Sequence, residues 1–150
     1  MSTTRIAING FGRIGRLALR RALQNNELEV ACVNDLADGE MLAYLFKRDS
    51  VHGSYPGDVS YENGTLVVDG TAIPFTANRD PREAGWGDMG VDVVLEATGV
   101  FTAREKAALH LEGGAKRVLV SAPAKGADLT VCMGVNHEDY DPSQHSIVSN

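Results

Sequence analysis

The chain has 150 residues, of which 43% are hydrophobic and 23% charged, and this composition excludes disordered, fibrous and membrane-embedded classes. The 20 acidic and 14 basic residues give a formal net charge of -6, which argues against strong electrostatic attachment to nucleic acid or to anionic lipid. We therefore expect one compact domain over residues 1–150, with no membrane span and no specific nucleic-acid partner.

The first 34 residues have the pattern of a strand, a helix and a second strand. Residues 5–9 form a short apolar run, and a glycine-rich turn separates this run from a helical pattern at residues 13–24. Residues 28–34 are largely apolar, as expected for a parallel strand that is covered on both faces.

A second helix is predicted at residues 39–47, with Asp38 as its N-cap. Its apolar side chains share one face: Met41, Leu42, Leu45 and Phe46. Residues 54–76 then predict a small antiparallel excursion, because Asn63-Gly64 and Asp69-Gly70 are typical of hairpin turns. The short strands that they separate are expected at residues 59–61, 65–68 and 71–75.

The last third of the chain returns to the pattern of buried strands. Strands are expected at residues 91–96 and 117–121, and between them Thr102 is expected to cap a helix that runs to about residue 112. Two further strand patterns follow, at residues 129–133 and 146–148.

The turn after the first predicted strand, Gly10-Phe11-Gly12-Arg13-Ile14-Gly15, is a G-x-G-x-x-G pattern that opens the first helix. Gly10 permits the tight turn, Gly12 lets the backbone approach a pyrophosphate, and Gly15 allows close packing of helix on strand. The free amides of the helix then face the phosphates. Together with the elements around it, the pattern predicts an α/β fold, a Rossmann-type doubly wound and mostly parallel sheet with a small antiparallel insertion at about residues 54–76.

An acidic residue follows the second predicted strand at the distance that dinucleotide-binding domains use. Asp35 lies 20 residues after Gly15. Its carboxylate can accept hydrogen bonds from ribose hydroxyls and would repel a 2′-phosphate, so it favours NAD over NADP. Glycine-rich turns also occur in proteins that bind no nucleotide, but here the strands, glycines, helix and acid agree in order and spacing. We therefore expect NAD as cofactor.

Other candidate positions have ordinary structural explanations as well. Arg13 lies in the first turn of the helix, where it can contact a phosphate or simply be solvated. Thr98-Gly99 and Ser121 follow predicted strands at the edge where open parallel sheets bind ligands, although common turns would also explain them. The four histidines show no zinc-ligand spacing, so no residue is assigned to a metal or to catalysis.

The N-terminus and the cysteines indicate a reducing compartment. Residues 1–4 lead directly into a strand pattern, without the basic and apolar regions of a secretory signal, so a cytoplasmic location is expected. Cys32 and Cys132 each lie in an apolar run with β-branched neighbours, where a thiol is usually a small buried hydrophobe. We expect both cysteines to pack in the core.

Six motifs occur in a fixed order along the chain: Asn9-Gly10-Phe11-Gly12-Arg13-Ile14-Gly15-Arg16, Asn34-Asp35, Asp49-Ser50-Val51-His52-Gly53, Arg79-Asp80-Pro81, Ala97-Thr98-Gly99-Val100-Phe101 and Ser121-Ala122-Pro123. With these motifs the sequence resembles the phosphorylating glyceraldehyde-3-phosphate dehydrogenases over essentially the whole chain. Erythrose-4-phosphate dehydrogenase shares the same framework, so it stays open as an alternative, as does a stand-alone nucleotide-binding or interaction module.

The resemblance implies roles for individual residues. Asn9, Arg13 and Ile14 would line the cofactor cleft, Asp35 would bind the adenosine ribose, and Arg79 would lie beside the adenine. Four more residues would approach the ribose or nicotinamide side: Thr98, Gly99, Phe101 and Ser121. With the glycine motif added, the expected cofactor-binding residues are Asn9, Gly10, Phe11, Gly12, Arg13, Ile14, Gly15, Asp35, Arg79, Thr98, Gly99, Phe101 and Ser121.

The resemblance also implies what the chain lacks. In relatives, a Ser-Asn pair like Ser149-Asn150 runs directly into the catalytic cysteine motif, and the other half supplies the general-base histidine. We therefore expect a truncated NAD-binding domain that binds cofactor without turnover, with the catalytic domain as its missing partner. Relatives also close this domain with a helix from their C-terminus, so an exposed apolar sheet face should promote self-association.

Overall fold

The computed structural model describes residues 3–150, and Met1 and Ser2 lie outside it. Its helices are α1 (Arg13–Ala22), α2 (Gly39–Lys47), α3 (Arg104–Ala107) and α4 (Leu109–Glu112), with two short 3-10 turns, η1 (Pro81–Glu83) and η2 (His137–Asp139). Its strands are β1 (Thr4–Asn9), β2 (Leu28–Asn34), β3 (Val59–Glu62), β4 (Thr65–Val68), β5 (Thr71–Thr76), β6 (Val93–Glu96), β7 (Arg117–Val120), β8 (Leu129–Thr130) and β9 (Ile147–Ser149). Within residues 3–150, no helix is both long and apolar enough to cross a membrane.

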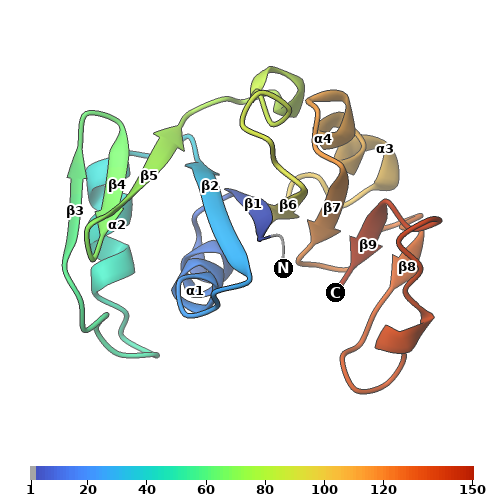
Figure 1. Cartoon of the computed structure of the whole chain (residues 1–150), viewed down its shortest axis with the longest axis horizontal. Coiled ribbons are helices and arrows are strands. Elements are labelled where there is room, and N and C mark those ends of the chain that lie inside the picture. The colour runs from blue at the N-terminus through green and yellow to red at the C-terminus, as the bar shows by residue number, and fades with distance from the viewer. Residues whose placement is uncertain (1–2) are drawn as a thin grey trace.

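The strands form one sheet in the order β3-β4-β5-β2-β1-β6-β7-β9-β8 (Figure 1). Across the sheet, each strand from β5 through β2, β1, β6, β7 and β9 to β8 is parallel to its neighbour. The β3–β4 and β4–β5 pairs are antiparallel. The chain builds outward from β1 to β2 in one direction and from β1 to β6 in the other, so the strand order reverses between β1 and β6. The doubly wound, mostly parallel α/β sheet predicted from the sequence is confirmed. Sheets of this kind bind ligands where the order reverses, at the carboxyl ends of the strands.

The antiparallel insertion is also confirmed, and two tight hairpin turns connect its three strands. The pairs Asn63-Gly64 and Asp69-Gly70 all have positive φ, between 49° and 80°, as the tight turns of two-residue hairpins require. However, β5 has a second role, because Phe75 and Thr76 pair in parallel with β2. Pro74, which has no N–H to donate, comes directly before this parallel pairing. The insertion is therefore joined to the main sheet through β5.

Alternation along the strands divides the core between two faces of the sheet. We call the side covered by α1 and α2 the first face, where Ile8 packs in one buried cluster with Leu19 and Phe46. Ala7 and Val94 lie in a cluster on the opposite, second face, with Trp86 from the segment before β6. On this second face α3 covers β7 and β9 through a third cluster: Ala107, Val118, Val120 and Ile147.

The helix predicted to begin at Thr102 begins later and is interrupted. Its N-cap is Ala103, which has extended backbone angles and no side-chain cap, and a turn at Ala108 separates α3 from α4. Thr102 accepts a backbone hydrogen bond from Lys125, and Ala103 forms an isolated parallel bridge with the same residue. This strand-like pairing holds the chain extended up to Ala103, which is why a capping role for Thr102 is wrong.

The strand predicted at residues 129–133 is shorter than expected, because β8 contains only Leu129 and Thr130. The side chain of Asn136 donates to the carbonyl of Thr130 at 2.9 Å and accepts from the amide of Cys132 at 2.7 Å, so the chain turns there. Cys132 is therefore exposed, and its predicted burial is wrong. The burial of Cys32 is confirmed.

The predicted apolar face of α2 is correct except at Met41, which is 51% exposed. Leu42 and Phe46 are buried as expected. The packing face is rotated toward Gly39, where a Cβ atom would lie 2.3 Å from the ring of Tyr61 on β3. The antiparallel hairpin thus packs on the side of α2 that carries Gly39, and Met41 faces away from it.

Candidate cofactor-binding site

The glycine turn between β1 and α1 is tightly packed at two of its positions. Gly10 has a φ of +96°, and a Cβ atom there would lie 2.6 Å from the backbone nitrogen of Thr98. A Cβ atom on Gly15 would lie 2.0 Å from the carbonyl oxygen of Gly10, so α1 rests directly on the turn. At Gly12, by contrast, nothing lies within 4 Å of such an atom, and the backbone is open to a ligand.

The N-terminus of α1 faces this open space. Gly12 is the N-cap, no side chain caps the helix, and the first turn contains no acidic residue. The first amides of a helix and its dipole favour an anion in this position. The helix end therefore fits the pyrophosphate of a dinucleotide.

Asp35 follows β2 and lies beside the glycine turn. Its Oδ2 accepts a hydrogen bond from the backbone N–H of Phe11 at 2.7 Å, and its Oδ1 accepts from the N–H of Ala37 at 2.8 Å. These bonds fix the carboxylate at the cleft while leaving acceptor capacity for ribose hydroxyls. A negative charge held there opposes a 2′-phosphate.

One cleft of about 340 Å³ joins these features at the carboxyl ends of β1, β2 and β6. Seven of the predicted residues line it: Asn9, Gly10, Gly12, Asp35, Arg79, Thr98 and Phe101. Arg79 reaches the cleft beside Asp80, whose carboxylate pairs with Arg82 at 2.6 Å. Hydrogen bonds from Arg82 lower the pKa of Asp80 to about 2.

Six other predicted residues lie outside the lining of this cleft: Phe11, Arg13, Ile14, Gly15, Gly99 and Ser121. The side chain of Phe11 is fully buried and stacks on Phe46, so only its backbone serves the site, through Asp35. Ser121 donates from Oγ to the carbonyl of Glu96 at 3.1 Å, which holds β7 against β6.

Arg13 and Ile14 line a neighbouring hollow on the other side of α1, beside residues 48–52. In this loop Asp49 accepts backbone hydrogen bonds from His52 and Val51, and these bonds lower the pKa of Asp49 below its usual value. The 49–53 motif is therefore a compact turn beside the hollow that Arg13 and Ile14 line.

Five residues that line the cleft were not predicted from the sequence: Asn34, Leu36, Asn78, Ala97 and Val100. Leu36 is 52% exposed and Val100 is 60% exposed, so each offers an apolar surface at the rim. Leu36 lies in the turn after β2 and Val100 in the turn after β6, and an exposed apolar residue in a turn that follows a polar strand end is the signal that could have identified them.

Three features meet where the strand order reverses: a glycine turn, a free helix N-terminus and a carboxylate at a strand end. Together they define a dinucleotide-binding domain. Comparison with known families narrows this class. Residues 4–104 match the family described as glyceraldehyde 3-phosphate dehydrogenase, NAD binding domain, and the chain belongs to this family. NAD is the cofactor of this domain family.

Similar proteins extend the match beyond residue 104. The chain is 54% identical to the glyceraldehyde-3-phosphate dehydrogenase of Geobacillus stearothermophilus over 97% of its length. It is 52% identical, also over 97% of its length, to glyceraldehyde-3-phosphate dehydrogenase 1 of Bacillus subtilis and to the Thermotoga maritima protein of that name. Each match covers 44% of the relative, so the chain spans less than half the length of these proteins.

Proposed function

We propose that residues 1–150 act as a single NAD-binding domain of a phosphorylating glyceraldehyde-3-phosphate dehydrogenase. The observation that carries this proposal is that the uncapped end of α1, Asp35 and Thr98 meet in one cleft at the reversal of strand order. Bound NAD would supply the hydride acceptor of the reaction. No residue of this chain is proposed as catalytic, so the chain alone is expected to bind cofactor without turnover.

The two sides of the cleft are proposed to bind different parts of NAD. Asp35 would hold the adenosine ribose and Arg79 would lie near the adenine, on the β2 side. The amides at the start of α1 would bind the pyrophosphate, and Thr98 and Phe101 would approach the other nucleotide on the β6 side. The names of the similar proteins favour this assignment over an erythrose-4-phosphate dehydrogenase, and a cytoplasmic location stays a prediction.

Calorimetric titration with NAD and NADP tests the proposal. Asp35→Asn keeps an oxygen for the Phe11 amide but removes the charge. We expect the unaltered chain to prefer NAD over NADP by about tenfold or more, and the variant to lose this preference and to bind NAD roughly tenfold more weakly.

The matched control is Asp88→Asn, which makes the same change of charge at an exposed position outside the cleft. It should leave the affinity for NAD unchanged. Equal binding of both dinucleotides by the unaltered chain, or unaltered selectivity in Asp35→Asn, would contradict the assignment of the ribose to Asp35.

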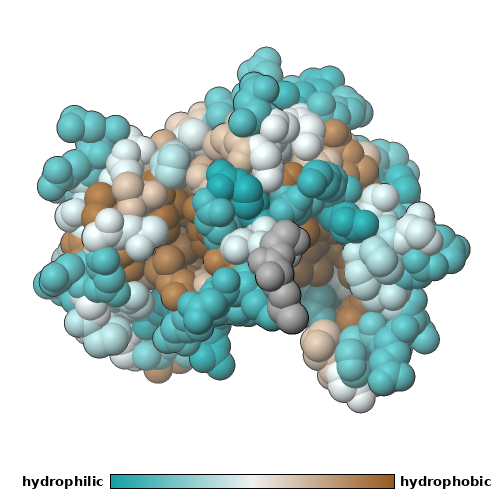
Figure 2. All heavy atoms as spheres, viewed as in Figure 1, coloured by the Kyte–Doolittle hydropathy of each residue, from teal (hydrophilic) through white to brown (hydrophobic). Residues whose placement is uncertain are grey.

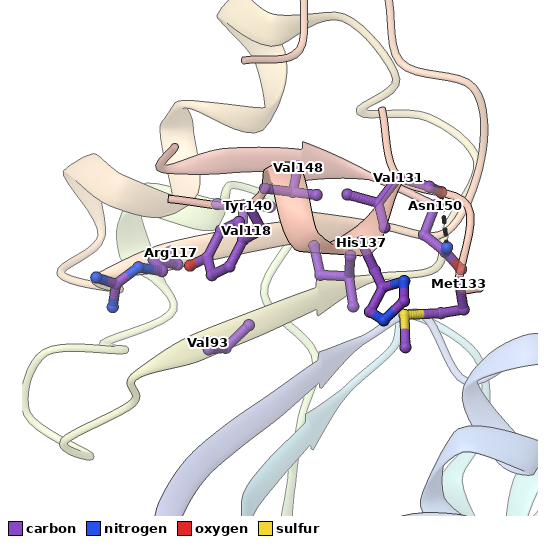
Figure 3. A pocket seen from close by; sticks show the side chains of 10 residues that line it. Val93, Arg117, Val118, Val131, Met133, His137, Tyr140, Val148 and Asn150 are labelled. Carbon is purple, nitrogen blue, oxygen red and sulfur yellow. Dashed lines mark hydrogen bonds between the residues drawn. The ribbon is translucent and has the colours of Figure 1, made fainter. Parts of the chain in front are cut away.

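A second surface supports a proposal about partners. An apolar groove of about 430 Å³ lies over β7 and β9 on the first face, beyond the region that α1 and α2 cover. Figure 3 shows Val131 and Val148 in this groove, between Tyr140 at one end and Met133 at the other. The space-filling view shows a mostly hydrophilic surface, with its broadest hydrophobic area at the left of the view, on the side of the antiparallel strands (Figure 2).

We propose that this groove is where the remainder of a longer chain packs, and that the isolated chain self-associates through it. Light scattering at several concentrations should show dimers or larger species. Met133→Lys, at a side chain in the groove that is 71% exposed, should shift the chain toward the monomer. Val51→Lys, at an exposed residue outside the groove, should not. A strictly monomeric unaltered chain would refute the proposal.

A further inference from the structure

Four buried polar residues of the described chain form one hydrogen-bonded network: Asn9, Asn34, Glu96 and His110. Glu96 is 1% exposed and His110 is fully buried. Neither residue is among the predicted cofactor-binding residues, and a fold alone does not require a carboxylate at this depth. A buried carboxylate is expensive unless donors surround it, so its partners indicate what it does.

The histidine side of the network has a fixed proton arrangement. Trp86 is the one tryptophan of the sequence, and its Nε1–H lies 3.1 Å from Nδ1 of His110. An indole nitrogen can only donate, so Nδ1 must accept and the ring proton must sit on Nε2. Nε2 of His110 then donates to Oε2 of Glu96 at 2.7 Å.

The other partners of Glu96 belong to the cofactor cleft. Oε2 also accepts from Nδ2 of Asn9 at 2.6 Å, and Oε1 accepts from the backbone N–H of Thr98 at 2.8 Å and from the Thr98 hydroxyl. All four groups that reach the carboxylate are donors, which suits an ionised carboxylate that can only accept. Asn9 and Thr98 both line the cleft.

The register of the sheet explains why these residues meet. Asn9, the last residue of β1, is the register partner of Glu96 on β6 and of Asn34 on β2. Asn9 Oδ1 accepts from Nδ2 of Asn34 at 2.8 Å, so the network crosses the floor of the cleft from β6 to β2. Phe101, another residue of the cleft, contacts the ring of His110 edge-on at a centroid distance of 5.7 Å.

We propose that Glu96 is a positioning residue of the cofactor site, oriented by His110 and Trp86, which sets Asn9 and Thr98 for the nucleotide on the β6 side of the cleft. This inference rests on the proposed binding of NAD. The β2 side, where Asp35 lies, does not depend directly on the carboxylate, because no hydrogen bond joins Asp35 to Glu96 among residues 3–150. Glu96 should therefore affect a dinucleotide and an adenosine mononucleotide differently.

The test compares NAD with AMP, by calorimetry, in Glu96→Gln. A glutamine has the same shape but only one oxygen, so either Asn9 and His110 or the two donors of Thr98 would face an NH₂ group. We expect the affinity for NAD to fall about tenfold or more, while the affinity for AMP stays within about twofold. Glu62→Gln, at an exposed residue of β3, is the matched control and should change neither affinity.

A purely structural role predicts a different result. Glu96→Gln would then melt at a lower temperature but bind both nucleotides as before, or lose both in proportion, and either outcome would overturn the inference. If the unaltered chain binds NAD and the variant binds it equally well, only this inference fails. If the unaltered chain binds neither nucleotide, the proposed function fails and the positioning role fails with it.

A second variant covers the case in which Glu96→Gln does not fold. Trp86→Phe removes the donor to Nδ1 of His110 together with part of a buried ring in the second-face core, outside the cleft, so the indole no longer confines the imidazole proton to Nε2. Nitrogen-15 NMR should show His110 protonated on Nε2 alone in the unaltered chain and a mixture of tautomers in Trp86→Phe. We expect a loss of NAD affinity of about two- to fivefold with AMP unchanged. A mixture in the unaltered chain, or unchanged NAD affinity in Trp86→Phe, would overturn the inference.

Discussion

Two regions of the first face of the sheet have similarly apolar strands, but helices cover one region and leave the other open. Around β1 and β2, α1 and α2 cover the strands, and Leu19 and Phe46 are completely buried. Around β7 and β9, apolar residues such as Leu119 and Val148 stay partly exposed in a groove. In both regions the second face is packed and the first-face side chains are apolar, although helices cover only one of the two first faces. Strand hydrophobicity therefore shows that a face can be buried, but not which part of a protein covers it.

The largest expected effect is on the free energy of unfolding, when a leucine is replaced by alanine in each of the two regions. Leu19→Ala removes a fully buried side chain and should lower the free energy of unfolding by about 2–5 kcal/mol. Leu119→Ala, in the open groove, should lower it by about 1 kcal/mol or less, because that side chain is partly solvated already. Urea unfolding measures both values. Equal losses would show that the groove is as well packed as the covered half.

A second prediction concerns Asp128, which stabilises the outer edge of the sheet. Its Oδ2 accepts from the amides of Ser146 and Ile147, both at 2.9 Å, and its Oδ1 pairs with Arg104 at 2.8 Å. Burial raises the pKa of Asp128, but these hydrogen bonds and the charge of Arg104 outweigh it, so the pKa lies below its ordinary value. Asp128→Asn should lower the free energy of unfolding by about 1–3 kcal/mol, measured by urea unfolding.

The direction of the pH dependence follows from the lowered pKa of Asp128. Because the carboxyl is more acidic in the folded chain, its contribution is complete above the unfolded pKa of about 3.9 and is lost as the pH falls through the lower folded value. The protection of the Ile147 amide against hydrogen exchange, relative to its intrinsic rate, should therefore fall in acid before that of Ile8 in the covered core. Asp139→Asn, at an exposed residue of the same region, is the control and should change neither rate.

The smallest expected effect concerns the two cysteines, Cys32 on β2 and Cys132 after β8. Burial raises the pKa of Cys32 to about 12, so at pH 8 roughly one thiol in ten thousand is ionised there. Cys132 is exposed in the turn after β8. A thiol reagent should label one cysteine rapidly and the second only after unfolding, and mass spectrometry should locate the first label on Cys132. Rapid labelling of Cys32 would mean that the covered half opens readily.

The regions also differ in how much could be predicted from the sequence. Where the local signal was strong, as in the glycine turn, the Asp38 cap and the Asn-Gly and Asp-Gly hairpins, the expected elements are confirmed. The errors at Thr102 and Cys132 have different sources: Lys125, far along the chain, holds the backbone extended before α3, whereas the nearby side chain of Asn136 ends β8. The helix-cap and strand patterns, on which the two predictions rested, show neither contact.

The candidate site shows the same limit. Asp35 and the glycines could be proposed from the sequence because their spacing is short and characteristic. Glu96 and His110 were not, because their relation to Asn9 depends on the pairing of β1 with β6, across 87 residues of sequence. The polar floor of the cleft is a product of the sheet topology.

The most direct test of the central claim is a titration of the nitrogen-15-labelled chain with NAD, followed by two-dimensional NMR. We predict that the amide signals of Gly12, Asp35 and Thr98 shift together and saturate at one affinity, while those of Val131 and Val148 in the groove stay in place. Shifts confined to the groove, or no shift at the three cleft residues, would contradict the claim that this cleft binds the dinucleotide.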